Sequence, residues 1–131
     1  MILVDTNVIL DVVGTHSAWR FWSMAALEES AGGDELFIDD VVYAELASGY
    51  REMAKLDEAL ATLRVARAQT PKLALFLAGH AFRQYRRRGT KTGVLPDFFI
   101  GAHAFVSGAA VLTRDRGFIE TYFPTVTLVS P

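Results

Sequence analysis

The sequence predicts an α/β protein with three layers, α/β/α, and a mostly parallel sheet of about five strands. Short runs of Ile, Leu, Val and Phe alternate along the chain with longer segments of helical periodicity, which is the pattern of successive βα units. Several of the short runs are apolar at every position, as in strands that are buried on both faces of a parallel sheet. The chain has 131 residues, 51% of them hydrophobic, so we expect residues 1–131 to form a single domain around one core.

The first elements alternate between strand and helix. Ile2–Val4 is an apolar run that ends at a polar residue and predicts a buried strand. A helix is expected over about residues 16–30, because a pair of glycines follows it. Leu36–Ile38 predicts the second strand, and Asp39 or Asp40 is suited to cap the helix that comes next.

The middle of the chain adds two helices around a short strand. Residues 51–63 have apolar side chains at three- and four-residue spacing, which predicts a helix. Val65–Arg67 predicts a short edge strand. Thr70 and Pro71 form a favourable helix start, so the next helix should run from there to Arg88, just before a glycine.

The last third of the chain completes the alternation. Residues 90–94 predict a loop, and a helix opened by a proline should follow over residues 96–106. Residues 109–113 predict a strand, and Gly117–Tyr122 predicts a short helix. Residues 126–129 predict the final strand.

Composition narrows the chemistry that the chain can perform. The chain contains no cysteine, which removes disulfides, thiolate zinc sites and cysteine nucleophiles and suits a reducing compartment. The first residues include neither a basic region nor a long apolar stretch, so we expect no signal peptide, no membrane span and a cytoplasmic protein. His16, His80 and His103 have no partners at the spacing of a zinc or histidine-base site, which favours surface or core roles for all three.

Four acidic residues lie at the edges of the predicted elements. Asp5 directly follows the first strand, and Asp115 lies two residues beyond the strand that ends at residue 113. The carboxyl ends of parallel strands meet at one edge of a sheet, where open α/β folds place their ligands. Asp97 lies in the first turn of a helix, where negative charge is favoured. Glu45 shares a helix face with two valines, so we expect its stem to be half-buried and its carboxylate to face the sheet edge.

A shared cation explains this set better than four separate caps or salt bridges, although helix capping is the stronger explanation for Asp97 taken alone. Carboxylates beside apolar strands are partly desolvated and repel one another, which is costly unless they gain a partner. Mg²⁺ or Mn²⁺ is suited to such a site, because these ions prefer oxygen ligands and keep water or phosphate in their remaining positions.

The net charge of −2 conceals an uneven distribution of charge. Residues 1–58 hold twelve acids and three bases, whereas residues 59–96 hold eight bases and no acid. This basic stretch, beside an acidic metal pocket, indicates a surface that binds nucleic-acid phosphates, with two further bases nearer the acidic residues. The alternative is a solvated helix end, at which basic side chains complement the helix dipole. The bases predicted to bind a nucleic-acid backbone, which is RNA if the resemblance given below holds for substrate, are Arg83, Arg86, Arg87, Arg88, Lys91, Arg114 and Arg116.

Taken together, these motifs resemble the PIN-domain family, and most closely its VapC-type ribonuclease toxins of bacterial and archaeal toxin–antitoxin pairs. The motifs are DTNVILD from Asp5, a helix that carries Glu45, LPDFFIGAHA around Asp97 and TRDRGF around Asp115. Each motif alone is weak, but their combination in this order is specific and spans essentially the whole chain. The resemblance implies a PIN-like parallel sheet of about five strands with the first strand at its centre.

The resemblance also implies an activity and a set of roles. The chain would be a metal-dependent endoribonuclease that hydrolyses RNA phosphodiester bonds, with Asp5, Glu45, Asp97 and Asp115 as its catalytic residues. Mg²⁺ or Mn²⁺ would lie chiefly between Asp5 and Asp97, with Asp115 as a further metal ligand. Glu45 would complete the site through direct or water-mediated contacts. The family's polar supporting positions fall on Thr6, Asn7 and Thr113.

The partners that the resemblance implies are an RNA substrate, a cognate VapB-like antitoxin protein and a second copy of the chain in a homodimer. The aromatic residues Trp19, Phe21 and Trp22 are spread too widely for one narrow buried stripe. They predict either a broad core face or an interface with one of these proteins. Asp11 belongs to the N-terminal motif, and local hydrogen bonding at a helix end is its expected role.

Three alternatives to the ribonuclease interpretation stay open. An aspartyl-nucleophile phosphatase also begins with an acid after its first strand, but its chemistry requires a second acid where this chain has Asn7. A non-catalytic or regulatory PIN-like RNA-binding module would retain the acidic pocket as a cation site. DNA could replace RNA as the substrate, because no recognisable motif here contacts base edges or a 2′-hydroxyl.

Overall fold

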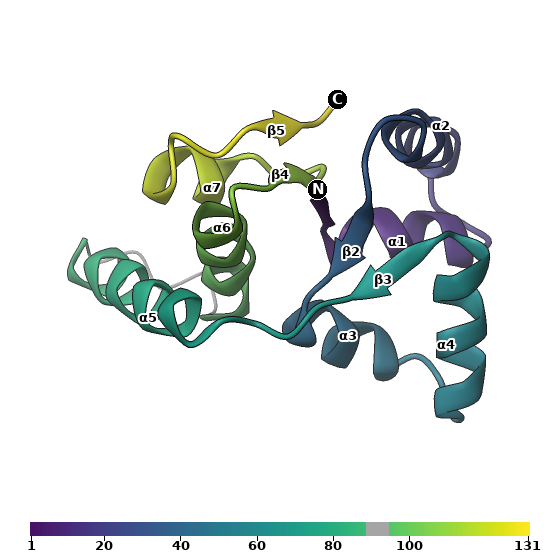
Figure 1. Cartoon of the computed structure of the whole chain (residues 1–131), viewed down its shortest axis with the longest axis horizontal. Helices are drawn as coiled ribbons and strands as arrows, with labels where there is room; N and C mark the ends of the chain where they lie inside the picture. The colour runs from purple at the N-terminus through teal and green to yellow at the C-terminus, as the bar shows by residue number, and fades with distance from the viewer. Residues whose placement is uncertain (89–94) are drawn as a thin grey trace.

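The computed structural model describes residues 1–88 and 95–131. Within them, five parallel strands form one sheet in the order β3-β2-β1-β4-β5, so β1 is central (Figure 1). The predicted α/β class, the parallel sheet and the central first strand are confirmed. The strands are β1 (Ile2–Val4), β2 (Leu36–Ile38), β3 (Val65–Arg67), β4 (Ala110–Leu112) and β5 (Leu128–Val129).

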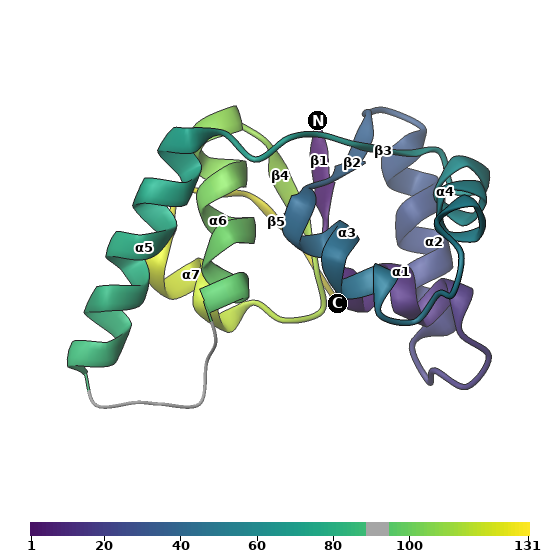
Figure 2. The same ribbon diagram turned by 90° about the horizontal axis from the view of Figure 1, so that it is seen from below.

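Helices cover the sheet on both faces, which makes the three layers of the fold. α1, α2 and α4 lie on one side of the strands, whereas α5, α6 and α7 lie on the other (Figures 1 and 2). No helix in the described part of the chain is long and apolar enough to cross a membrane. The helices are α1 (Thr6–Val13), α2 (Arg20–Ala31), α3 (Asp40–Ala47), α4 (Met53–Thr62), α5 (Lys72–Arg87), α6 (Leu95–Ser107) and α7 (Gly117–Tyr122).

The core lies on both faces of the central strands, because every residue of β1 and β2 is buried. On the α6 side, Phe98 is fully buried and contacts the rings of Tyr85 and Tyr122 edge-on or tilted. Gly101 allows Phe123 to pack against α6, since a Cβ atom there would lie 2.5 Å from Cδ2 of the Phe123 ring. This packing fixes α6, whose first turn carries Asp97.

Most predicted elements are present with small shifts at their ends, but the N-terminal region differs. The helix expected over residues 16–30 begins at Arg20, and a separate helix, α1, precedes it. The Val and Ile residues of α1 favour strands locally, so burial against the sheet decides its conformation. Asp39 caps α3 as predicted, and its Oδ1 accepts a hydrogen bond of 2.9 Å from the Val42 amide. The predicted loop at residues 90–94 lies outside the described residues.

Candidate active site

The predicted acidic residues come from neighbouring elements at the carboxyl edge of the sheet. β1 and β4 pair in parallel, with Val4 opposite Leu112, so Asp5 and the segment after β4 leave the sheet side by side. The backbone amide of Asp5 donates a hydrogen bond of 2.9 Å to the Leu112 carbonyl. α6 begins at the same end of the molecule, and its first turn holds Asp97 (Figure 2). Topology therefore gathers at one edge groups that are far apart in the sequence.

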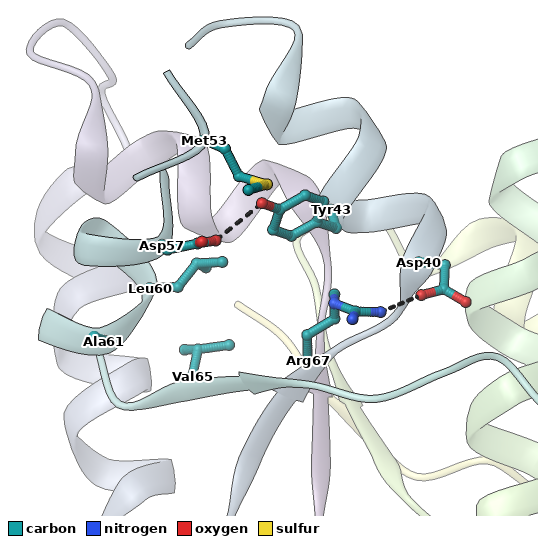
Figure 3. Close-up of a pocket in the computed structure, with 8 residues that line it drawn as sticks. All are labelled: Asp40, Tyr43, Met53, Asp57, Leu60, Ala61, Val65 and Arg67. Atoms are coloured by element: carbon teal, nitrogen blue, oxygen red, sulfur yellow. Dashed lines mark hydrogen bonds and ion pairs between the residues drawn. The ribbon is translucent and has the colours of Figure 1, made fainter. Parts of the chain in front are cut away.

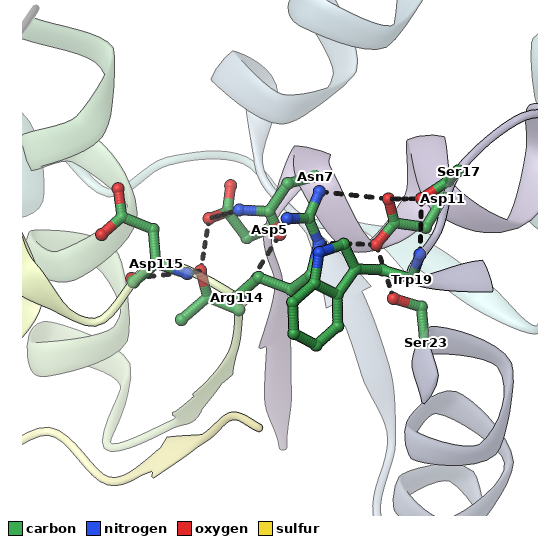
Figure 4. Close-up of polar contacts among 9 residues, drawn as sticks. Asp5, Asn7, Asp11, Ser17, Trp19, Ser23, Arg114 and Asp115 are labelled. Atoms are coloured by element: carbon green, nitrogen blue, oxygen red, sulfur yellow. Dashed lines mark hydrogen bonds and ion pairs between the residues drawn. The ribbon is translucent and has the colours of Figure 1, made fainter. Parts of the chain in front are cut away.

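Asp5 is held by two of the predicted supporting residues (Figure 4). The Thr113 hydroxyl donates a hydrogen bond of 2.7 Å to Oδ2 of Asp5, and the Asn7 amide donates one of 3.1 Å to the same oxygen. Thr113 is fully buried and its hydroxyl also accepts from the Asp115 backbone amide at 2.9 Å. Thr113 thus connects Asp5 to the backbone that carries Asp115.

Glu45 is joined to the site through the third supporting residue. The hydroxyl of Thr6, at the start of α1, donates a hydrogen bond of 3.0 Å to Oε1 of Glu45 on α3. Thr6 is buried, but Glu45 as a residue is exposed rather than half-buried as expected. The residue as a whole is therefore open to solvent, whereas its carboxylate is partly desolvated where it meets Thr6.

Burial and mutual repulsion shift the ionisation of two of these carboxyls. Burial raises the pKa of Asp5, and the charges of Asp97 and Asp115 raise it further, against the opposing hydrogen bonds from Thr113 and the Thr6 amide. Burial of its carboxylate also raises the pKa of Glu45, with contributions from Asp5 and Asp97. The carboxylates are thus close enough to repel one another electrostatically, and a bound cation would relieve this repulsion.

Asp115 is exposed and terminates the loop after β4. Its Oδ1 accepts a hydrogen bond of 3.1 Å from the Gly117 amide at the start of α7. Arg116 beside it is also exposed and pairs with Glu120, Nε to Oε1, at 2.7 Å.

The predicted RNA-binding bases on α5 are exposed, as a phosphate-binding surface requires. Arg86 lies over the Phe82 ring at 5.8 Å, and Arg88 lies over the Tyr122 ring at 5.5 Å. The last turn of α5 lies at the same end of the molecule as the start of α6 (Figure 2). Lys91, which was also predicted to bind RNA, lies outside the described residues.

Arg114 and Asp11 have contacts that the sequence did not predict. The Arg114 guanidinium forms two hydrogen bonds with the Asp11 carboxylate, at 2.7 and 3.1 Å, instead of extending into solvent. Asp11 was expected to bond locally near a helix end, and it does accept a hydrogen bond from Ser17, but its ion-pair partner is 103 residues away. No local pattern signals such a pair, because it exists only after α1 and the segment after β4 have been brought together.

A pocket elsewhere on the molecule contains none of the four predicted acids. It has a volume of about 420 Å³ and lies between α3, α4 and β3 (Figure 3). Its polar groups are paired with one another: Tyr43 donates to Asp57 at 2.9 Å, and Arg67 donates to Asp40 at 2.8 Å. This pocket is separate from the acidic edge.

Two histidines lie on the surface and the third lies in the core. His16 and His80 are exposed, and the His80 ring contacts that of Phe76 at 4.5 Å. His103 is buried in α6 against Phe37, and its Nδ1 lies 3.6 Å from Oδ2 of Asp39.

Comparison with known protein families identifies the family of this chain. The PIN domain family matches residues 2–124, which is nearly the whole sequence. The chain belongs to the PIN domain family. A comparison with curated protein sequences finds no match.

Solved structures share the fold of this PIN domain at low sequence identity. VapBC2 from Rickettsia felis, bound to a DNA fragment from its promoter, is 20% identical over 99% of this chain and 98% of that one, with a TM-score of 0.73. VapBC-1 from nontypeable Haemophilus influenzae is 21% identical over 99% and 98%, with a TM-score of 0.72. Mycobacterium tuberculosis VapC20, described as a sarcin-ricin loop cleaving toxin, is 16% identical over 100% of both chains, with a TM-score of 0.65.

The donor set of this PIN domain fits a hard divalent ion. The candidate ligands are carboxylate oxygens. Burial, and in smaller part repulsion from neighbouring acids, raises the pKa of Asp5 and Glu45. Across residues 1–88 and 95–131, no three acidic or histidine side chains are already gathered around one point. An ion here would therefore take some of its ligands from water or phosphate, as Mg²⁺ usually does.

The raised pKa of Asp5 makes a prediction about stability. Above the raised pKa, the Asp5 carboxylate is ionised in the folded protein, where its charge costs more than in the unfolded chain, so it lowers the free energy of unfolding. Asp5→Asn should therefore raise the thermal unfolding midpoint at pH 7 in the presence of a chelator. The gain should shrink as the pH falls through the raised pKa, because the wild-type carboxyl is then protonated. Glu58→Gln, which alters an exposed pair with Lys55, is the matched control and should change the midpoint little. A lower midpoint for Asp5→Asn at pH 7 would contradict this electrostatic account.

Proposed function

We propose that this PIN domain is an endoribonuclease that depends on Mg²⁺ or Mn²⁺ and serves as the toxin of a toxin–antitoxin pair. The observation that carries the proposal is the position of Asp5, Asp97, Asp115 and Glu45 near one edge of the sheet. Burial, with smaller contributions from neighbouring acids, raises the pKa of Asp5 and of Glu45. A buried structural carboxylate would be expected to lie beside a cation from the chain, whereas Asp5 lies among other acids.

The residues at the site would have different roles in metal binding and catalysis. Asp5, Asp97 and Asp115 would hold the ion, and Thr113 and Asn7 would keep the Asp5 carboxylate oriented through their hydrogen bonds. Glu45, which is oriented by Thr6, would accept a proton from the attacking water or position it. The bound ion would supply Lewis-acid stabilisation of charge on the phosphate and lower the pKa of a coordinated water.

RNA would reach the acidic site along a basic surface. The exposed arginines at the end of α5 offer phosphate-binding charge at the end of the molecule where Asp97 lies. Arg116, two residues after Arg114, adds an exposed base beside Asp115. Such contacts hold the nucleic-acid backbone without selecting a sequence, so the preferred RNA must be determined by experiment.

The catalytic test is RNA cleavage in Mg²⁺ and in Mn²⁺ by Asp5→Asn and Asp97→Asn. Loss of a group that stabilises transition-state charge typically costs on the order of 10²–10³ in rate, and we expect losses of at least that size. Because Asp5→Asn should be more stable than wild type, unfolding would not explain its inactivity. Cleavage at the wild-type rate by either folded variant would remove that residue from the site.

The same assays separate the alternatives. A non-catalytic RNA-binding module would bind RNA without cleaving it in either ion. An aspartyl-nucleophile phosphatase would turn over a chromogenic phosphomonoester, whereas the proposed nuclease would not. Parallel assays with DNA of the same sequence would show whether the 2′-hydroxyl is required.

The basic surface is tested by binding rather than by cleavage. Arg86, Arg87 and Arg88 replaced together by Gln in the Asp5→Asn background should weaken RNA binding. Each single-strand phosphate contact contributes about 0.7 to the slope of log affinity against log salt, so the slope should fall by roughly 2 if all three bind phosphate. Replacing the exposed bases Arg51 and Lys55 by Gln is the control. An unchanged slope would assign the α5 arginines to a solvated helix end.

A cognate antitoxin and a homodimeric toxin are part of the proposal. VapBC2 and VapBC-1, which share this fold, and a toxin–antitoxin complex from Klebsiella pneumoniae, with a TM-score of 0.67, support an antitoxin partner. The cytoplasm is the expected compartment. Chain isolated from its native cells should carry a small second protein, and the mass of the complex should indicate two copies of this chain. Recovery as a lone monomer would contradict both expectations.

A further inference from the structure

Asp11 is a buried carboxylate near the site, and it lies outside the acidic group described above. It is 3% exposed, and four hydrogen bonds reach its two oxygens (Figure 4). The Ser17 hydroxyl donates at 2.6 Å and the Ser23 hydroxyl at 2.7 Å. Arg114 donates through both Nε, at 2.7 Å, and Nη2, at 3.1 Å. Asp11 therefore ties α1 and α2 to the segment that follows β4.

Arg114 is held on a second side by an aromatic ring. Its guanidinium carbon lies 5.4 Å from the centre of the Trp19 ring, within the range of a cation–π contact. The Arg114 side chain is 28% exposed, compared with 50% for Arg116. A guanidinium that is paired in two-point fashion with a buried carboxylate and covered by an indole is held in one orientation and is less open to a phosphate than the more exposed Arg116.

The backbone of Arg114 is joined to the catalytic residues on both sides. Arg114 stands between Thr113, which donates to Asp5, and Asp115. Its own amide donates to Oδ1 of Asn7 at 3.3 Å, and the Asn7 amide group donates in turn to Asp5. Fixing the Arg114 side chain therefore restrains Thr113, Asp115 and Asn7 together.

We propose that the Asp11–Arg114 ion pair, covered by Trp19, positions the metal-binding carboxylates Asp5 and Asp115 and does not contact RNA. This inference rests on the proposed function and assigns Arg114 a positioning role in place of the RNA-binding role that its sequence suggested. The ionisation of Asp11 suits the pair: burial raises the pKa of its carboxyl, but the hydrogen bonds from Arg114, Ser17 and Ser23 outweigh it and bring the pKa below its usual value.

The test uses Arg114→Lys, which keeps the charge and loses the two-point geometry, together with Asp11→Asn. Mn²⁺ binding is measured without RNA, from the loss of the free-ion signal in electron paramagnetic resonance. Loss of a group that orients metal ligands costs roughly 10–100-fold in affinity, so both variants should bind Mn²⁺ at least about tenfold more weakly than wild type. The rate of RNA cleavage at saturating RNA should fall with it.

Two further variants make the test specific. Arg67→Lys alters an exposed arginine–aspartate pair, Arg67 with Asp40, at β3, which is two strands away from β1 in the sheet, and should leave Mn²⁺ affinity at the wild-type value. Arg116→Gln is the comparison for RNA contact, and in the Asp5→Asn background it should lower the salt slope of RNA binding by about 0.7. Arg114→Lys in that background should leave both RNA affinity and the slope unchanged.

Each result supports or overturns the inference. Folded Arg114→Lys and Asp11→Asn proteins that bind Mn²⁺ as wild type does would overturn the positioning role while leaving the proposed function intact. Weaker RNA binding with unchanged Mn²⁺ affinity would assign Arg114 to RNA. A wild-type chain that binds no Mn²⁺ and cleaves no RNA would overturn both proposals together.

Discussion

The parallel pairing of β1 with β4 is the constraint on which the acidic site depends. It places Val4 opposite Leu112, so the residues that follow both strands leave the sheet at the same edge. Thr113 can then donate to Asp5 across 108 positions of sequence, and Asp115 follows on the same loop. Central placement of β1 also brings α1 and α3 to this edge, where Thr6 meets Glu45. One pairing of three-residue strands thus determines where most of the polar side chains of the site lie.

The same arrangement places carboxylates close together, and their repulsion lowers the stability of the fold. Hydrogen bonds from Thr113 and the Thr6 amide favour the ionised form of Asp5, but burial and the neighbouring acids outweigh them and raise its pKa. A chain under selection for stability alone would relieve this repulsion with a neutral or basic side chain. A cation-binding site requires the repelling acids to be kept, because the bound ion supplies the compensating positive charge.

Asn7 lies between two carboxylates with different surroundings: Asp5, which lies near other acids, and Asp11, which is paired with Arg114. Towards the sheet, the Asn7 side-chain amide donates to Asp5, whose pKa is raised by burial and then by the charges of Asp97 and Asp115. Towards α1 and α2, it contacts the Arg114 backbone, and the Arg114 side chain neutralises Asp11. A paired, buried carboxylate is rigid and unavailable to an ion, so it is suited to support, whereas the repelling acids are suited to binding.

The fold class, the strands and the positions of Asp5, Thr113 and Asp115 at strand ends could be predicted from the sequence, because strand burial and helix periodicity are local patterns. The sequence also indicated Asp39 as a cap, since capping involves a residue and its near neighbours. Tertiary structure alone decided that α1 is helical, that Glu45 is exposed and that Arg114 faces Asp11. These features depend on contacts between segments far apart in the chain. A side chain's partner is settled only when such segments meet, and no local pattern records that meeting.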